Sequence, residues 1–128
     1  MYQLALLELM HTKLTRKSIV NQSYIFDPIH SIQESKYLRE IGLQADCITD
    51  CHRCVRSRTV FLMIHCTKNM YESVLKANET SISNVVIIGN SFQSMGIECV
   101  REVPLAIFDD CLSAFNNTAI MFFDNHSI

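Results

Sequence analysis

The sequence predicts an α/β fold in three layers, with helices on both faces of a mostly parallel sheet. Short apolar runs rich in β-branched residues alternate with segments of helical periodicity. That alternation is typical of βαβ units joined by right-handed crossovers. The two strongest runs, 59–64 and 85–88, are apolar throughout, as expected for strands covered on both faces of a parallel sheet. Together these observations favour a Rossmann-like arrangement.

Length, composition and charge fit a single domain that spans residues 1–128. The chain is long enough to bury a core, and with 48% hydrophobic residues it is too apolar to be disordered. A formal net charge of −2 argues against broad electrostatic attraction to nucleic acid or to an anionic membrane. Protein or small-molecule partners are therefore expected.

The first elements are predicted from local signals. Apolar residues at helical spacing predict a helix over 2–10. A β-prone run at 23–26 stops at Asp27-Pro28, because proline cannot donate to a strand ladder. A helix is predicted over 31–42, because a serine with a glutamate three residues later forms a capping box and a glycine closes the segment.

The rest of the chain continues the alternation, with one weak stretch. We predict a strand at 43–48, a strand at 59–64, a helix at 68–77, a strand at 85–88 closed by Gly89, and a last strand at 118–123. Between 96 and 117, Pro104 breaks any long element, and 105–112 is predicted as a short helix.

The N-terminus resembles neither a signal peptide nor a membrane span. No apolar run approaches the roughly 18 residues that a membrane-spanning helix needs. Glu8 interrupts the apolar start, and no basic segment precedes it. We therefore expect the six cysteines to be reduced thiols in a cytoplasmic or nuclear protein.

Five segments, in order and at matching spacing, resemble the sensitivity-to-red-light-reduced family. They are Gln3–Leu7, Tyr24–Pro28, Thr59–Cys66, Tyr71–Asn78 and Val86–Phe92. The resemblance covers nearly the whole chain and implies a non-catalytic regulatory protein on a Rossmann-like scaffold. It links plant relatives to red-light signalling and circadian rhythm, animal relatives to clock-gene expression and haem biosynthesis, and fungal relatives to microtubule-related processes.

The chain departs from the family pattern in two places. The family places a short strand and a glycine-containing loop before the first helix, whereas here the sequence begins at that helix. We expect this first strand and loop to be missing, because Met1 is a late start or the chain is a fragment or a degenerate copy. A sheet edge left open in this way would be free to pair with a second copy as a homodimer. The second departure is Ile64, where the family has proline before the His-Cys pair.

Polar residues that follow predicted strands are the candidate ligand-binding residues. Open α/β sheets bind ligands at the carboxyl ends of their strands. Asp27 ends the first run, either as a ribose-binding acid or as part of a strand-terminating turn. His65 follows the strand predicted at 59–64 and precedes Cys66. Asn90 and Ser91 follow the strand predicted at 85–88 and its closing Gly89, and they form either a ligand-binding loop or a helix N-cap. We predict no catalytic residue and name no cofactor.

Two groups of metal-ligating and nucleophilic side chains have alternative interpretations. Adjacent His65 and Cys66 are suited to catalysis or to haem or metal ligation. Neighbours on a strand point to opposite faces, however, which favours a histidine beside a buried thiol. A zinc site is a weak alternative to incidental thiols in a loop, because four ligands crowd together without a second spaced pair: Cys47, Cys51, His52 and Cys54. The neighbouring arginines are interpreted as a solvated face: Arg53, Arg56 and Arg58.

Three functions from different classes follow. The leading one is a regulatory protein that acts through protein partners. The second is a nucleotide- or S-adenosylmethionine-binding enzyme with a site at Asp27, His65 and Asn90. The third is a metal- or haem-binding sensor that uses His65 or the 47–54 cluster.

Overall fold

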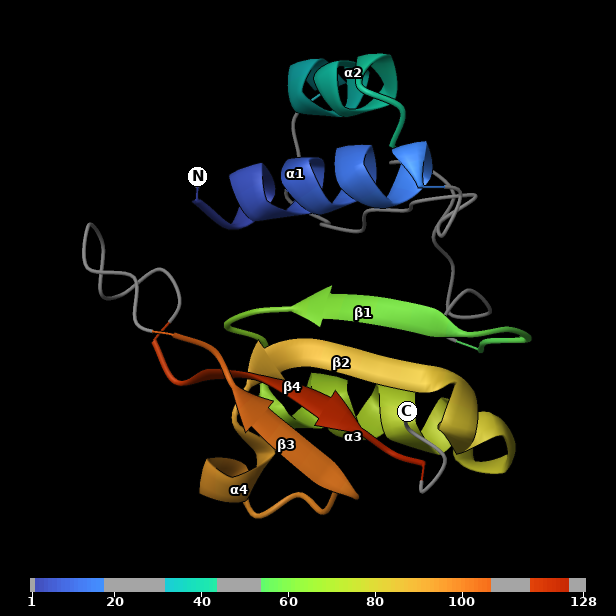
Figure 1. Ribbon diagram of the computed structural model, residues 1–128, viewed down its shortest axis with the longest axis vertical. Helices are drawn as coiled ribbons and strands as arrows, with labels where there is room; N and C mark the ends of the chain where they lie inside the picture. The colour runs from blue at the N-terminus through green and yellow to red at the C-terminus, as the bar shows by residue number, and fades with distance from the viewer. Residues whose placement is uncertain (1, 18–31, 44–53, 107–115, 125–128) are drawn as a thin grey trace. The chain divides into compact units, whose positions relative to one another are not determined.

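The computed structural model describes residues 2–17, 32–43, 54–106 and 116–124 (Figure 1). The chain divides into two compact units, Met1–His52 and Arg53–Ile128. The described part of the first unit is helical, and the second unit contains the sheet. No helix among the described residues is long and apolar enough to cross a membrane.

The first unit contains α1 (Tyr2–Arg16) and α2 (Ile32–Glu40). Both predicted helices are confirmed, and α1 continues past its predicted end. A Schellman motif closes α2: the Gly42 N–H donates to the Arg39 carbonyl and the Leu43 N–H to the Leu38 carbonyl, at 3.1 and 2.9 Å. Gly42 has a φ of 94°, the left-handed conformation that this motif requires. The predicted strand at 23–26 lies outside the described residues, as does nearly all of the one at 43–48, and Leu43 itself is not in a strand.

The second unit is built on a four-stranded sheet with the order β1-β2-β4-β3. The strands are β1 (Thr59–Met63), β2 (Val85–Asn90), β3 (Arg101–Pro104) and β4 (Thr118–Phe122). The pair β1–β2 is parallel, whereas β2–β4 and β3–β4 are antiparallel. The prediction of a mostly parallel sheet is therefore wrong for the part of the chain that the structure describes, where the sheet is mixed.

The error has a physical reason in β2. This strand lies between β1 and β4, and its residues Val85–Gly89 are all buried. An uninterrupted apolar run reports that both faces of a strand are covered, but it does not report the direction of the neighbouring strands. The predicted βαβ unit itself is confirmed. Between β1 and β2 the chain passes through α3 (Lys68–Ala77) and the short 3₁₀ segment η2 (Glu79–Asn84).

The strand β3 was not predicted from the sequence. Pro104 was expected to break structure, but it is the last residue of β3. Among the described strands β3 pairs only with β4, so it is an outer strand of the sheet. An edge strand tolerates proline, because one side of its backbone needs no partner. Leu105 and Ala106 are not helical, and the rest of the helix predicted at 105–112 lies outside the described residues.

The core of the second unit lies between the sheet and α3 (Figure 1). Its buried members come from three strands, α3 and the short α4 (Phe92–Met95): Met63, Tyr71, Val74, Val85, Ile87, Phe92, Ala119 and Met121. Tyr71 and Phe92 meet edge to face, with ring centroids 5.2 Å apart. Both α3 and α4 contribute to this one core, so the described residues of this unit do not show the predicted three layers.

Candidate functional site

The structure brings two of the predicted ligand-binding positions together at one end of the sheet. His65 lies in the turn directly after β1, and Asn90 is the last residue of β2. The His65 N–H donates to the Asn90 side-chain oxygen Oδ1 at 2.7 Å. Ser91 follows Asn90 directly, whereas Asp27 lies outside the described residues.

Asn90 connects this end of the sheet to its surroundings. Besides the His65 N–H, its Oδ1 lies 3.3 Å from the Tyr71 hydroxyl, and its Nδ2 donates to the Asn116 carbonyl at 3.3 Å. The Asn90 backbone N–H donates to the Tyr71 hydroxyl at 3.0 Å, and that hydroxyl in turn donates to the Met63 carbonyl. The Asn90 amide is therefore engaged with the chain itself on both of its polar atoms.

The turns on either side of Asn90 both contain a left-handed residue. His65 has a φ of 62° and Asn117 a φ of 53°, in a region where histidine and asparagine are found more often than most residues. The Ser91 N–H donates to the Asn117 carbonyl at 2.8 Å, and the Asn117 Nδ2 donates to the Ser94 Oγ at 2.9 Å. We call the exposed residues around Asn90 the polar rim: His65, Ser94, Asn116 and Asn117.

Ser91 acts as a helix N-cap. It is buried, and its Oγ accepts from the Ser94 N–H at the start of α4. The same Oγ donates to the Glu102 carboxylate at 2.6 Å. The other carboxylate oxygen accepts from the Phe92 and Gln93 N–H groups at 2.7 and 3.2 Å. A carboxylate of the chain therefore occupies the first turn of α4, which supports the N-cap interpretation of Ser91.

Cys66 differs from its neighbour in the predicted pair. His65 is exposed, whereas Cys66 is half-buried and packs against the core. Burial raises the pKa of the Cys66 thiol, and because the thiolate is the nucleophile, a raised pKa opposes nucleophilic chemistry at neutral pH. Burial also raises the pKa of the neighbouring Tyr71 hydroxyl.

Comparison with known proteins identifies the family. The model of the SRR1 domain matches residues 1–122. The chain belongs to this family. It is 36% identical over 72 residues to Protein SENSITIVITY TO RED LIGHT REDUCED 1 of Arabidopsis thaliana, a match that covers 54% of the chain and 26% of that protein. The chain therefore spans about a quarter of the length of this relative. No solved structure matches.

These comparisons confirm the family resemblance inferred from the five segments. Several residues of those segments hold this SRR1 domain together. Asn90 and Tyr71 are two of them, and a third is Asn78, which is fully buried. Its Oδ1 accepts from the Val55 N–H at 2.6 Å, and its Nδ2 donates to the Val74 carbonyl at 2.8 Å. It therefore ties the segment before β1 to the end of α3.

The predicted cysteine cluster is described only at Cys54. This residue is exposed, and its thiol donates to the Ala77 carbonyl at 3.5 Å. Cys47, Cys51 and His52 lie outside the described residues. Where the structure describes the chain, no group of three histidine, cysteine or acidic side chains is placed to hold a metal ion.

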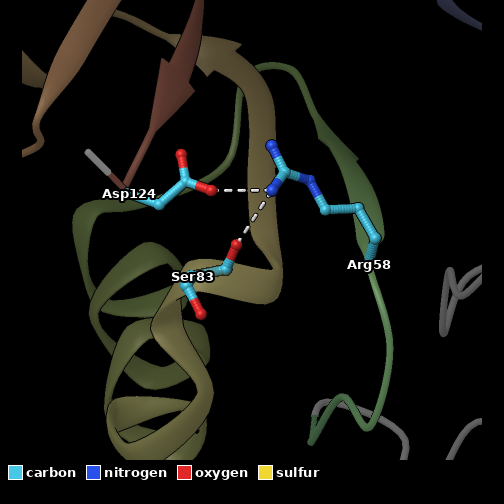
Figure 2. A network of polar contacts seen from close by, with 3 residues as sticks. All are labelled: Arg58, Ser83 and Asp124. Atoms are coloured by element: carbon cyan, nitrogen blue, oxygen red, sulfur yellow. Dashed lines mark hydrogen bonds and ion pairs between the residues drawn. The ribbon is translucent and has the colours of Figure 1, made fainter. Parts of the chain in front are cut away.

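A second polar network ties together three elements of the SRR1 domain (Figure 2). The Arg58 Nη1 lies 2.7 Å from the Asp124 Oδ2 and 3.2 Å from the Ser83 carbonyl. The Asp124 side chain is 7% exposed and the Arg58 side chain 51%. Arg58 is therefore exposed, as expected for a solvated face, but it also pairs with a buried carboxylate. The second oxygen of Asp124 is buried without a hydrogen-bond partner among the described residues.

The described residues also form an open depression of about 380 Å³ beside α4. It is lined by Gln93 and by residues 97–102. None of His65, Asn90 and Ser91 lines it. Arg101, which does, lies over the Phe122 ring at 4.4 Å. This depression is therefore separate from the polar rim.

We expect Asn90→Ala to loosen the polar rim. The substitution removes the acceptor of the His65 N–H and the donor to the Asn116 carbonyl, at a cost of about 1–3 kcal/mol. Hydrogen exchange at the His65 amide is the measurement, and faster exchange is expected. Asn90→Asp keeps the acceptor and should protect that amide better than alanine does. Equal protection in both variants would contradict the assigned contact.

We expect Cys66 to be alkylated more slowly than the exposed Cys54 at pH 8, by about tenfold or more. The reason is that burial raises the Cys66 pKa above its ordinary value of 9.0, so its rate should still be rising above that pH. Mass spectrometry after timed treatment with iodoacetamide measures both rates. In concentrated urea the two rates should converge. Equal rates in the native protein would show that Cys66 is not protected.

Proposed function

We propose that this SRR1 domain is a non-catalytic regulatory protein that acts in light signalling by binding a protein partner at the polar rim. The name of the plant relative connects that protein with sensitivity to red light. Because the chain spans about a quarter of that relative, the function of the whole relative comes to this chain only as part of the proposal.

One observation carries the non-catalytic part of the proposal: the polar groups at the strand ends are engaged with the chain itself. Both polar atoms of the Asn90 amide bond to backbone groups. The Ser91 hydroxyl bonds to Glu102, and burial raises the pKa of the Cys66 thiol. These groups would have to break internal contacts or become ionised before they served a substrate or a cofactor.

The polar rim supports the partner-binding part. Its residues are exposed, and hydrogen bonds to Asn90, Ser91 and Ser94 hold its two turns in place. Binding residues are frequently found on loops that a rigid scaffold positions in this way. An exposed imidazole beside side-chain amides offers hydrogen-bond donors and acceptors, which suits a hydrogen-bonding protein surface.

Affinity capture with a rim variant tests the proposal. His65→Gly removes the imidazole, and glycine accepts the left-handed conformation at that position. Lys76→Ala, at an exposed position on α3, is the matched control. We expect a protein from cells of the same organism to be retained by the wild type and the control, and about tenfold less by His65→Gly. Equal retention by all three would contradict binding at the rim.

Thermal-shift measurements test the rival functions. The proposal predicts that nucleotides, S-adenosylmethionine, haemin and zinc leave the melting temperature unchanged. A ligand that binds only the native state raises that temperature. A rise with a nucleotide or S-adenosylmethionine would favour the enzyme, and a rise with haemin or zinc would favour the sensor.

Membership of the family supports the finer parts of the proposal. We extend it to circadian rhythm and to regulation of haem biosynthesis, in the cytoplasm or the nucleus, with neither nucleic acid nor a membrane as partner. The near-neutral charge supports this choice of partner. Localisation of a fluorescently tagged chain and measurement of clock-gene transcripts after its depletion would test these points. Unchanged rhythms would remove the circadian part.

We also propose that a homodimer forms through an open sheet edge. Among the described strands, β1 and β3 are the outer ones. The edge strand β3 carries charges and Pro104, which disfavour pairing, whereas β1 is uncharged and leaves Val60 46% exposed. We expect sedimentation to show a dimer that Val60→Lys abolishes and that Val103→Lys on β3 retains. A wild-type chain that stays monomeric at high concentration would contradict the proposal.

A further inference from the structure

An exposed serine lies between two arginines just before β1. Ser57 and its neighbours Arg56 and Arg58 are all exposed, and Arg56 and Ser57 lie in a bend rather than in a helix or strand. The Ser57 carbonyl accepts from the Thr59 hydroxyl at 2.9 Å. Serine kinases that recognise Arg-Ser dipeptides need an exposed serine in this charge context, and the segment meets both conditions.

The arginine on the C-terminal side of this serine has a structural partner. The Arg58 guanidinium pairs with Asp124 at 2.7 Å (Figure 2). The two side chains differ in exposure, because half of Arg58 reaches solvent, whereas Asp124 is 7% exposed. Arg58 can therefore exchange one anionic partner for another, but Asp124 has no second cation among the described residues.

We propose that Ser57 is a phosphorylation site and that its phosphate competes with Asp124 for Arg58. An arginine-directed serine kinase transfers the γ-phosphoryl group of ATP to the Ser57 Oγ. The new P–O bond forms on Oγ, the bond from the γ-phosphorus to the bridging oxygen breaks, ADP leaves, and a base of the kinase takes the hydroxyl proton. The product carries a charge of about −1.5 to −2 on the residue that precedes Arg58 in the chain.

The competition has a structural consequence. Arginine binds phosphate through paired, charge-assisted hydrogen bonds, so the phosphate is expected to draw the guanidinium away from the buried carboxylate. Asp124 would then remain buried without its cation, which is unfavourable. Arg58 precedes β1, Ser83 ends η2 and Asp124 follows β4. Phosphorylation would therefore loosen this end of the sheet, and this inference does not depend on the proposed partner.

The test combines phosphorylation with a variant of Asp124. The folded 128-residue chain is treated with ATP and a kinase specific for Arg-Ser dipeptides, and the modified peptide is mapped by mass spectrometry with Ser57→Ala as control. We expect phosphate at Ser57 and a fall in melting temperature of about 5 °C. Asp124→Asn has no buried charge that could lose its cation. In this variant we expect the same modification with less than half of that fall in melting temperature.

Three outcomes would overturn the inference: no phosphate at Ser57, an unchanged melting temperature, or an equal fall in Asp124→Asn. A second test, which needs no kinase, compares the melting temperatures of Ser57→Glu and Ser57→Gln. The glutamate variant should melt below the glutamine variant, and this difference should disappear in the Asp124→Asn background. A difference that persists there would show that the charge acts elsewhere.

Discussion

Replacing Gly89 with alanine is expected to lower the free energy of unfolding by about 2–4 kcal/mol. A Cβ atom at this position would lie 2.6 Å from the Tyr71 hydroxyl oxygen and 2.9 Å from the Met63 carbonyl oxygen. Neither neighbour can give way easily, because Tyr71 is fully buried and the Met63 carbonyl belongs to the adjacent strand. Overpacking of this kind costs about 1–3 kcal/mol, and displacement of the Tyr71 hydroxyl adds the loss of its hydrogen bonds.

Urea unfolding followed by circular dichroism measures this loss, with Gly96→Ala as the matched control. Gly96 has a left-handed φ of 71°, but a Cβ atom there meets nothing within 4 Å. Its substitution should therefore cost only the conformational penalty of about 1–2 kcal/mol. Adding Tyr71→Phe to Gly89→Ala should recover part of the loss, since it removes the nearest atom. A Gly89→Ala variant as stable as Gly96→Ala would contradict the close approach.

Removing Arg58 is expected to destabilise the protein more than neutralising Asp124. Arg58→Ala leaves a buried carboxylate without its cation, which costs about 3–5 kcal/mol for a fully buried pair. Because the Arg58 side chain is 51% exposed, we expect about 2–3 kcal/mol after allowance for solvent screening. Asp124→Asn leaves the half-exposed guanidinium in contact with water and should cost about 1 kcal/mol.

Chemical denaturation of the two variants tests this order. Arg56→Ala is the control, because Arg56 is exposed in the same segment. A change at such a surface position is expected to stay within about 0.5 kcal/mol. If Asp124→Asn proved the more damaging variant, the buried carboxylate would not depend on Arg58.

The local elements of this SRR1 domain could be predicted because their signals are local. The helix before Gly42 ends there because its closing turn requires a left-handed residue, a conformation that glycine adopts readily. The runs that became β1 and β2 are apolar enough to be strands in any arrangement of the sheet. Because β1 and β2 run parallel, the polar residues that follow them lie at the same end of the sheet, and His65 and Asn90 do meet there.

Gly89 and Pro104 show where local signals mislead. Gly89 was expected to close a strand in a turn, but it lies inside β2, where the ring of Tyr71 occupies the space of a side chain. Pro104 was expected to break structure, but it lies in an edge strand. In both cases the residue type restricts what the backbone can do, whereas its neighbours decide which of the permitted arrangements is used.

By itself the sequence determined the family, the βαβ unit and the burial of β2, because each of these is signalled by short runs of neighbouring residues, whereas β1, which is equally apolar, leaves Val60 46% exposed. Only the tertiary structure decided the direction of β4, the capping of α4 by Glu102 and the pairing of Arg58 with Asp124. The last two residues are 66 positions apart, and a single charge in a sequence carries no mark of its partner. Hydrophobicity reports that a segment is buried, whereas direction and pairing depend on which segments the folded chain brings together.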